Sequence, residues 1–126
     1  RRDIAHILQN VIDVCAENEE QMYRIYSTAG IRERLYDGFD TFSDVRIAKG
    51  MSVKVIAIGE GGEKRGLDER KWLNKKTGTP TYILIYPGKT AYISLDAKGE
   101  PVGVVIENDG VYQTQKMVFD SLWKVL

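Results

Sequence analysis

The sequence has few of the residues that build metal, disulfide or nucleophilic centres. It contains one cysteine, Cys15, and one histidine, His6. A lone cysteine excludes a disulfide within the chain and a cysteine-based zinc cluster, and it fits a reducing compartment. A lone histidine argues against a histidine metal site or a histidine general base. Both residues fall in a helical pattern, so we interpret them as structural.

The sequence also lacks excess charge and long apolar runs. Lysine and arginine together number 18, as do aspartate and glutamate. Because binding to a phosphate backbone needs clustered positive charge, we do not expect this chain itself to bind DNA. No apolar run approaches the roughly 20 residues of a membrane span, and no signal peptide is visible. We therefore expect a soluble, cytoplasmic protein. Since the chain begins at Arg1 rather than Met, we expect it to be a fragment.

What is present is the composition of one globular domain. The chain has 126 residues, of which 43% are hydrophobic and 29% are charged. That length supports one real core but not two ordinary domains.

The first 20 residues read as a helix with one apolar stripe, because the apolar residues recur at i, i+3, i+4 and i+7. The stripe consists of Ile4, Ile7, Leu8, Val11, Ile12 and Cys15. Two such heptads also fit the end of a coiled coil. We therefore expect a linker helix over residues 1–20, with Ile4, Ile7, Leu8 and Val11 as dimerisation residues, ahead of an α/β domain over 21–126. The alternative is that the stripe packs on the sheet of that domain.

The remaining segments alternate between strand and helix patterns. We expect strands at 21–28, 51–58 and 101–108, a hairpin at 80–96, a helix or two bent near Gly38 over 29–50, a short helix at 67–74 within a glycine-rich loop, and a final helix capped by Asp109. The first strand, helix and second strand form a βαβ unit, which should cross over right-handed. The sequence thus predicts an α/β fold with a mixed sheet of about five strands and helices on both faces.

This order of elements, with "VGVVIEN" followed by a helix that ends in "FDSLW", resembles the phospholipase D-like α/β domain. More closely, it resembles the C-terminal effector half of TrmB-type transcriptional regulators. The resemblance implies a winged-helix DNA-binding domain and a coiled-coil helix upstream. It also implies a degenerate phospholipase-like domain that binds a small molecule, often a sugar, without a cofactor.

The hairpin "PTYILIYPGKTAYISLD" bears on whether such a domain is catalytic. Active phospholipase D-like domains carry His-x-Lys and then Asp ahead of a Gly-Lys turn. Alignment on Gly88–Lys89 puts Pro80 at the histidine position, Tyr82 at the lysine position and Pro87 at the aspartate position. These residues supply neither a nucleophile nor a counter-charge for phosphate. We therefore expect a protein that is not an enzyme.

Polar residues near the ends of the expected strands are the candidates for ligand binding, because ligands of open α/β sheets sit beyond the carboxyl ends of the strands. The candidates are Ser27, Thr28, Gly59, Glu60, Tyr82, Glu107, Asn108 and Gln113. Their hydroxyl, carboxylate and amide groups suit a polyol, and Tyr82 adds an aromatic face. Each candidate also has a structural interpretation. Ser27 and Thr28 can cap a helix, and Glu107 can pair with an arginine.

Three classes of function stay open. The first is a non-catalytic, dimerising domain of a transcriptional regulator that senses a small polar metabolite, for example a sugar, and reaches DNA only through another domain. The second is a structural protein-interaction module with no ligand. The third is an enzyme that acts through carboxylates such as Glu60 and Glu107. We favour the first, because the sequence shows no nucleophile with a base beside it.

Overall fold

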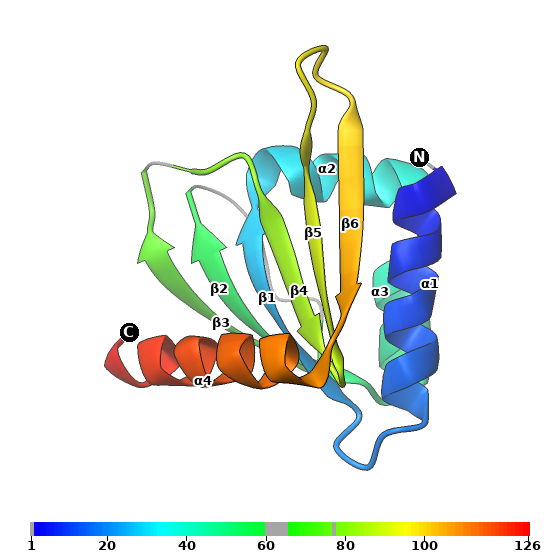
Figure 1. Ribbon diagram of the computed structural model, residues 1–126, viewed down its shortest axis with the longest axis vertical. Helices are drawn as coiled ribbons and strands as arrows, with labels where there is room; N and C mark the ends of the chain where they lie inside the picture. The colour runs from blue at the N-terminus through cyan, green and yellow to red at the C-terminus, as the bar shows by residue number, and fades with distance from the viewer. Residues whose placement is uncertain (1, 60–65, 77) are drawn as a thin grey trace.

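The structure is a computed structural model that describes residues 2–59, 66–76 and 78–126 (Figure 1). The helices are α1 (Arg2–Ala16), α2 (Ala29–Gly38), α3 (Phe42–Ala48) and α4 (Asp109–Val125). The strands are β1 (Met22–Thr28), β2 (Ser52–Ile58), β3 (Asp68–Asn74), β4 (Tyr82–Tyr86), β5 (Lys89–Leu95) and β6 (Pro101–Glu107).

The strands form one mixed sheet of six, in the order β3-β2-β1-β4-β5-β6. The pairs β1–β2 and β2–β3 are parallel, whereas β1–β4, β4–β5 and β5–β6 are antiparallel. The predicted α/β class with a mixed sheet is confirmed, with one strand more than expected. For residues 29–50 we expected either one helix or two bent near Gly38. The structure has two, α2 and α3.

The extra strand is β3, where we expected a short helix over 67–74, so that prediction was wrong. The charged residues of this segment disfavour a strand by propensity alone. Pairing with β2 supplies the backbone hydrogen bonds, and charged side chains are well tolerated on a strand at the edge of a sheet. Tertiary pairing therefore overrides local preference here.

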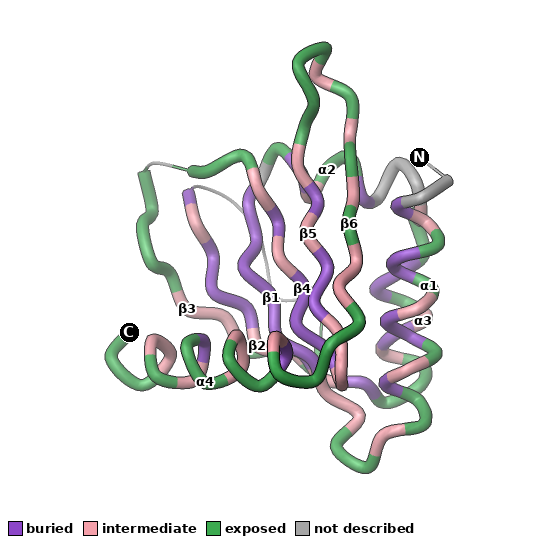
Figure 2. The backbone as a smooth tube through the Cα atoms, viewed as in Figure 1, coloured by how far each residue is buried: buried purple, intermediate pink, exposed green. Residues whose placement is uncertain are grey.

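Helices cover both faces of the sheet. On one face, α1, α2 and α3 pack with residues of β1, β2, β4 and β5 in the larger hydrophobic cluster. On the other face, α4 packs through Tyr112 and Phe119 on Tyr26, Ile56 and Ile85. Central strand β1 is buried almost along its whole length because it is covered from both sides (Figure 2).

The apolar stripe of α1 is buried against the sheet within one chain. Ile4 and Leu8 are each 1% exposed, and Val11 is fully buried. Ile7 comes so close to β6 that a Cβ atom built at Gly103 would lie 2.7 Å from Ile7 Cδ1. The helix that we expected to be a linker is therefore packed as part of the α/β domain. In this conformation its Ile4, Ile7, Leu8 and Val11 offer no surface to a second copy.

Helix α4 is fixed to the sheet by charge and aromatic contacts as well as by apolar ones. Arg24 on β1 and Asp120 on α4 form an ion pair at 2.7 Å. Phe119 contacts the ring of Tyr26 edge-on, at 5.2 Å between centroids, and stacks on Trp123. The helix begins after Asn108, whose side chain accepts a hydrogen bond from the Val111 amide, so Asn108 and not Asp109 is the N-cap.

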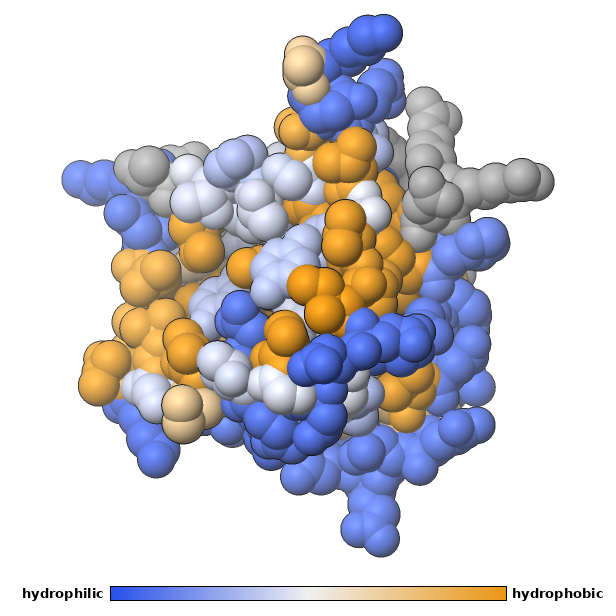
Figure 3. Space-filling model, in the orientation of Figure 1, coloured by the Kyte–Doolittle hydropathy of each residue, from blue (hydrophilic) through white to orange (hydrophobic). Residues whose placement is uncertain are grey.

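Helix α4 leaves part of its face of the sheet uncovered. Figure 3 views this face and shows hydrophobic side chains gathered over β5 and β6. Val102 and Val104 on β6, and Met117 on α4, are exposed. None of the described helices is long and apolar enough to cross a membrane.

Candidate ligand-binding site

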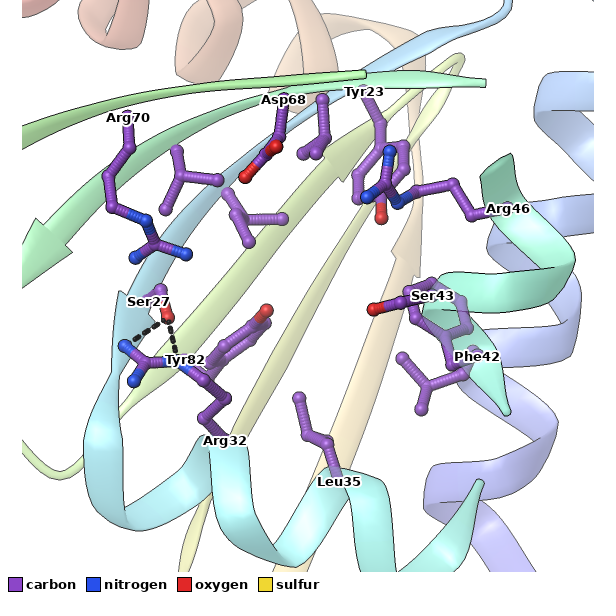
Figure 4. Close-up of a pocket in the computed structure, with 14 residues that line it drawn as sticks. Tyr23, Ser27, Arg32, Leu35, Phe42, Ser43, Arg46, Asp68, Arg70 and Tyr82 are labelled. Carbon is purple, nitrogen blue, oxygen red and sulfur yellow. Dashed lines mark hydrogen bonds between the residues drawn. The ribbon is translucent and has the colours of Figure 1, made fainter. Parts of the chain in front are cut away.

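A cavity of about 160 Å³ lies between the sheet and the helices α2 and α3 (Figure 4). Its floor is built from the sheet by Tyr23, Ile25, Ser27, Val53, Val55, Asp68, Arg70 and Tyr82. Its walls are Leu8 of α1, Arg32 and Leu35 of α2, and Phe42, Ser43 and Arg46 of α3.

The floor follows from the period of two in a β-strand. Alternate residues of a strand face the same side of a sheet. Tyr23, Ile25 and Ser27 therefore point to one face of β1, and Asp68 and Arg70 point to that face from β3. The β1–β4 register pairs Tyr26 with Ile83, so its next step places Tyr82 opposite Ser27. Polar and apolar side chains of distant segments thus meet over one patch of the sheet.

Among the described residues that line the cavity, arginines outnumber carboxylates. The described lining contains three guanidinium groups, of Arg32, Arg46 and Arg70, and one carboxylate, of Asp68.

The guanidinium of Arg46 ties three elements together. Arg46 is only 3% exposed. Its Nη1 donates to the carbonyl oxygens of Met51 and Leu67 at 3.0 and 3.3 Å, and its Nη2 donates to that of Gly66 at 2.9 Å. Arg46 thereby joins α3 to the starts of β2 and β3, and we assign it a structural role at the edge of the cavity.

Arg32 and Ser27 form the polar corner of the cavity. Nε and Nη2 of Arg32 donate to Ser27 Oγ at 3.0 and 2.9 Å. A guanidinium donates hydrogen bonds and accepts none, so Arg32 cannot take a proton from this hydroxyl. Figure 4 shows the hydroxyl oxygens of Ser43 and Tyr82 pointing into the space between the sheet and the helices. This arrangement suits binding of a polar molecule better than nucleophilic chemistry.

Of the residues that we predicted for the site, Ser27 and Tyr82 line the cavity. Thr28 does not line the cavity. It is buried at the N-cap of α2 but makes no capping bond through its side chain. Its hydroxyl has no hydrogen-bond partner within the described part of the chain. The Gly59 amide donates to the Asn74 carbonyl, continuing the pairing of β2 with β3. Glu60 lies outside the described residues.

The remaining predicted residues do not line this cavity. Three antiparallel pairings in succession make β6 run opposite to β1 (Figure 1). The carboxyl end of β6 therefore lies at the other end of the sheet. There Glu107 pairs with Lys89 at 3.1 Å rather than with an arginine, and Asn108 caps α4. Gln113 is exposed on α4, beside a groove shared with Glu20 and Lys116.

Sequence reasoning missed the charged residues of the cavity. Arg46 stands between the apolar residues Val45 and Ile47, which is a sign that its charge meets a specific partner. Asp68 and Arg70 alternate, which is a strand pattern, but the prediction of a helix over 67–74 concealed it. Arg32 offered no such signal, because an arginine near the start of a helix is ordinary.

Two buried groups outside the cavity have strongly shifted pKa values. Burial raises the pKa of the Cys15 thiol to about 12, so it stays protonated and is a poor nucleophile or metal ligand at neutral pH. Burial, with smaller contributions from Glu107 and Cys15, raises the pKa of Tyr86 to about 12. Tyr86 donates its hydroxyl hydrogen to Asn10 Oδ1 at 3.0 Å, where Lys89 also donates. Both side chains are buried in the hydrophobic core, and we assign them a structural role.

Comparison with known proteins identifies the fold. No family model matches the sequence, and no curated protein matches it. Among solved structures, the chain is similar to TrmBL2, described as an archaeal chromatin protein with a novel mode of DNA binding. The TM-score is 0.55 at 16% identity, over 96% of this chain and 50% of that one. The chain thus spans about half of TrmBL2 and shares the fold of that part.

Proposed function

We propose that this chain is a non-catalytic effector-binding and dimerising domain of a transcriptional regulator, with its ligand in the cavity beneath α2 and α3. The observation that carries the proposal is the cavity itself, where arginine, serine and tyrosine side chains converge on space left open beside the core. Pockets that bind small molecules combine apolar walls with a few convergent polar groups in this way.

The size and lining of the cavity support a bound polar molecule. A single water needs only about 10–15 Å³ of such space, so about 160 Å³ accommodates several waters or a small metabolite. Arg32, Ser27 and Tyr82 supply the polar contacts, and Leu35 and Val55 supply apolar ones. A sugar-like polyol fits this mixture.

The position of α1 supports a route for signalling. Leu8 lines the cavity from α1, so a ligand there would contact the first helix directly. In our proposal this contact shifts α1 and, through it, a DNA-binding domain outside this chain. Such coupling requires the ligand to bind one position of α1 more tightly than another. The similar protein TrmBL2, which is about twice as long, is described as binding DNA.

A second candidate function is a structural protein-interaction module with no ligand. The exposed apolar side chains of Val102 and Val104 on β6 favour it, because exposed apolar surface often marks a protein–protein contact. The two functions differ in whether the cavity binds anything.

A thermal-shift screen of this chain against sugars, sugar phosphates and small carboxylic acids separates them. A ligand at 100 times its dissociation constant adds about 2.7 kcal/mol of stability, which is several degrees for a domain of this size. We expect Ser27→Ala to reduce the shift, because it removes the group that orients Arg32. Gln113 is an exposed residue of α4 outside the cavity lining, so Gln113→Ala is the control and should leave the shift intact. If no compound shifts the melting temperature, the interaction module is the better account.

A further inference from the structure

We propose that two copies of this chain join along β6 and form one continuous sheet across a two-fold axis beside Val104. The inference rests on the proposed function, because it supplies the surface through which the proposed regulator domain dimerises. The apolar stripe of α1 is packed within its own chain in this conformation, so the surface for a second copy has to lie elsewhere.

The first observation is the contrast between the two edges of the sheet. The strand order places β3 at one edge and β6 at the other (Figure 1). Residues Asp68 to Lys71 of β3 are all charged, and charged side chains keep an edge strand from pairing with another chain. Strand β6 carries no charge between Pro101 and Glu107. Its edge therefore lacks the protection that β3 has.

The second observation is the exposure of apolar side chains on β6. Val102 and Val104 are 47% and 60% exposed, and alternation places them on the same face as Ile106. The strand registers set Ile106 opposite Thr90, and Thr90 opposite Ile85, which packs under α4. All three β6 side chains thus lie on the face that α4 covers only in part, where Figure 3 shows hydrophobic side chains.

The third observation is the direction of the backbone groups of β6. The Asp96 amide donates to the Glu100 carbonyl at 2.8 Å, so these residues form a hydrogen-bonded pair. Such pairs alternate along an antiparallel ladder. The even-numbered residues of β6 therefore turn their backbone groups toward β5, whereas Gly103 and Val105 turn theirs outward. Both keep partial exposure to solvent although α1 packs on their face of the sheet.

An antiparallel pairing centred on Val104 matches the backbone of β6 to itself. Gly103 then exchanges hydrogen bonds with Val105 of the second copy, and Val105 does so with Gly103 of the second copy. Pro101, which has no N–H to donate, lies opposite Glu107 of the second copy. The missing donor therefore falls at the end of the ladder, where a proline is tolerated. A two-fold interface of this kind uses the same patch on both copies.

The same register also matches the side chains. Val104 packs beside its own counterpart, and Val102 packs beside Ile106 of the second copy, so that one apolar strip crosses the axis. The two Glu107 side chains lie at opposite ends of the ladder, and each is paired with Lys89 of its own chain at 3.1 Å. No like charges meet within the paired strands, which favours a second copy as the occupant.

The first test is sedimentation velocity of the whole chain over a range of concentrations. We expect Val104→Lys to raise the dissociation constant of the dimer tenfold or more, because two like charges would then face each other across the axis. Val118→Lys is the matched control, since Val118 is an exposed valine on α4, and it should dimerise as the wild type does. Circular dichroism and the melting temperature show whether each variant folds.

The second test is oxidative crosslinking, which reports the register. Residue 104 and its counterpart form a non-hydrogen-bonded pair, with Cα atoms about 4.5 Å apart. That separation lies within the usual disulfide range of about 4.4–6.8 Å, so Val104→Cys should crosslink two copies. Val102→Cys is the control. The two copies of residue 102 would be about 14 Å apart, since a strand rises about 3.4 Å per residue, and should not crosslink.

A dimer that survives Val104→Lys, or that crosslinks through Val102→Cys as readily as through Val104→Cys, would overturn the inference. The proposed function would then stand, with its dimer interface elsewhere on the molecule. A wild-type chain that stays monomeric at every concentration would remove both this interface and the dimerising part of the proposed function. The thermal-shift screen would still decide ligand binding independently.

Discussion

Arginine shows how far the role of a residue depends on partners that lie far away in the sequence. Arg24 pairs with Asp120, 96 positions along the chain. Arg46 holds the carbonyls that begin β2 and β3, whereas Arg32 holds a hydroxyl only five positions away. The sequence predicted Ser27 for the site because the carboxyl end of a strand is locally recognisable, and Tyr82 because it offers an aromatic face on the hairpin. It could not predict which arginines reach them, since that depends on the packing of helices over the sheet.

At the residue scale, we predict that stability falls above about pH 9. Burial raises the pKa of Cys15 and of Tyr86 to about 12, so folding favours their protonated forms. Their contribution is complete below the unfolded-state pKa values of about 8.5 and 10. It is lost as the pH rises from those values toward 12.

Urea unfolding at pH 7, 9 and 11 checks this prediction. The wild-type midpoint should change little between pH 7 and 9 and drop between pH 9 and 11, and that drop should be shallower in the double variant Cys15→Ala, Tyr86→Phe. An equally steep drop in the double variant would show that other groups control the alkaline stability.

At the scale of elements, local sequence patterns predicted the bounds of most helices and strands but not which elements they pack against. The hairpin, β6 and α4 lie within two residues of their expected bounds, because alternation, turn residues and helix periodicity are properties of short segments. The prediction of a helix over 67–74 was wrong, because this segment becomes a strand through its pairing with β2 and not through its composition. The stripe of α1 fitted both a coiled coil and a sheet, and only the packing distinguishes them.

The contact between α1 and β6 gives a prediction at this scale. Gly103→Ala would force a Cβ atom to within 2.7 Å of Ile7 Cδ1. Overpacking of this kind costs about 1–3 kcal/mol. Ile7→Val removes the Cδ1 atom and alone costs about 0.5–1.5 kcal/mol.

Because the two substitutions relieve the same contact, the double variant should lose less stability than the sum of the single variants, as measured by denaturant unfolding. Gly30→Ala is the control, since no atom lies within 4 Å of its added Cβ. It should be neutral or slightly stabilising in α2. Strict additivity would mean that α1 moves freely against β6.

At the scale of the whole molecule, the class of fold was predictable and the direction of the strands was not. Six strands can be ordered in many ways, and the antiparallel run from β4 to β6 moved Glu107 and Asn108 to the opposite end from Ser27. The net charge of zero, in contrast, is a property of the sequence itself. It governs what the molecule attracts at long range.

We predict that the chain sediments as a dimer and does not bind duplex DNA by itself at physiological salt. A protein without net positive charge gains little from displacing counterions on DNA. Sedimentation velocity over a range of concentrations, with and without a labelled duplex, measures both properties. Since the α1 stripe is buried, Val11→Ala should lower stability without dissociating the dimer. A monomer at every concentration, or DNA that sediments with the protein, would contradict the prediction.

The near contact of Ile7 with Gly103 also has a consequence for how related sequences diverge. The terminal methyl of one residue fills the space that a side chain at the other would need. Positions 7 and 103 should therefore change together. A homologue that gains a side chain at the position of Gly103 must shorten the residue at the position of Ile7, or else tilt its first helix away from the sheet. Because Leu8 of that helix lines the cavity, such a tilt would reshape the ligand site without replacing any polar residue in it.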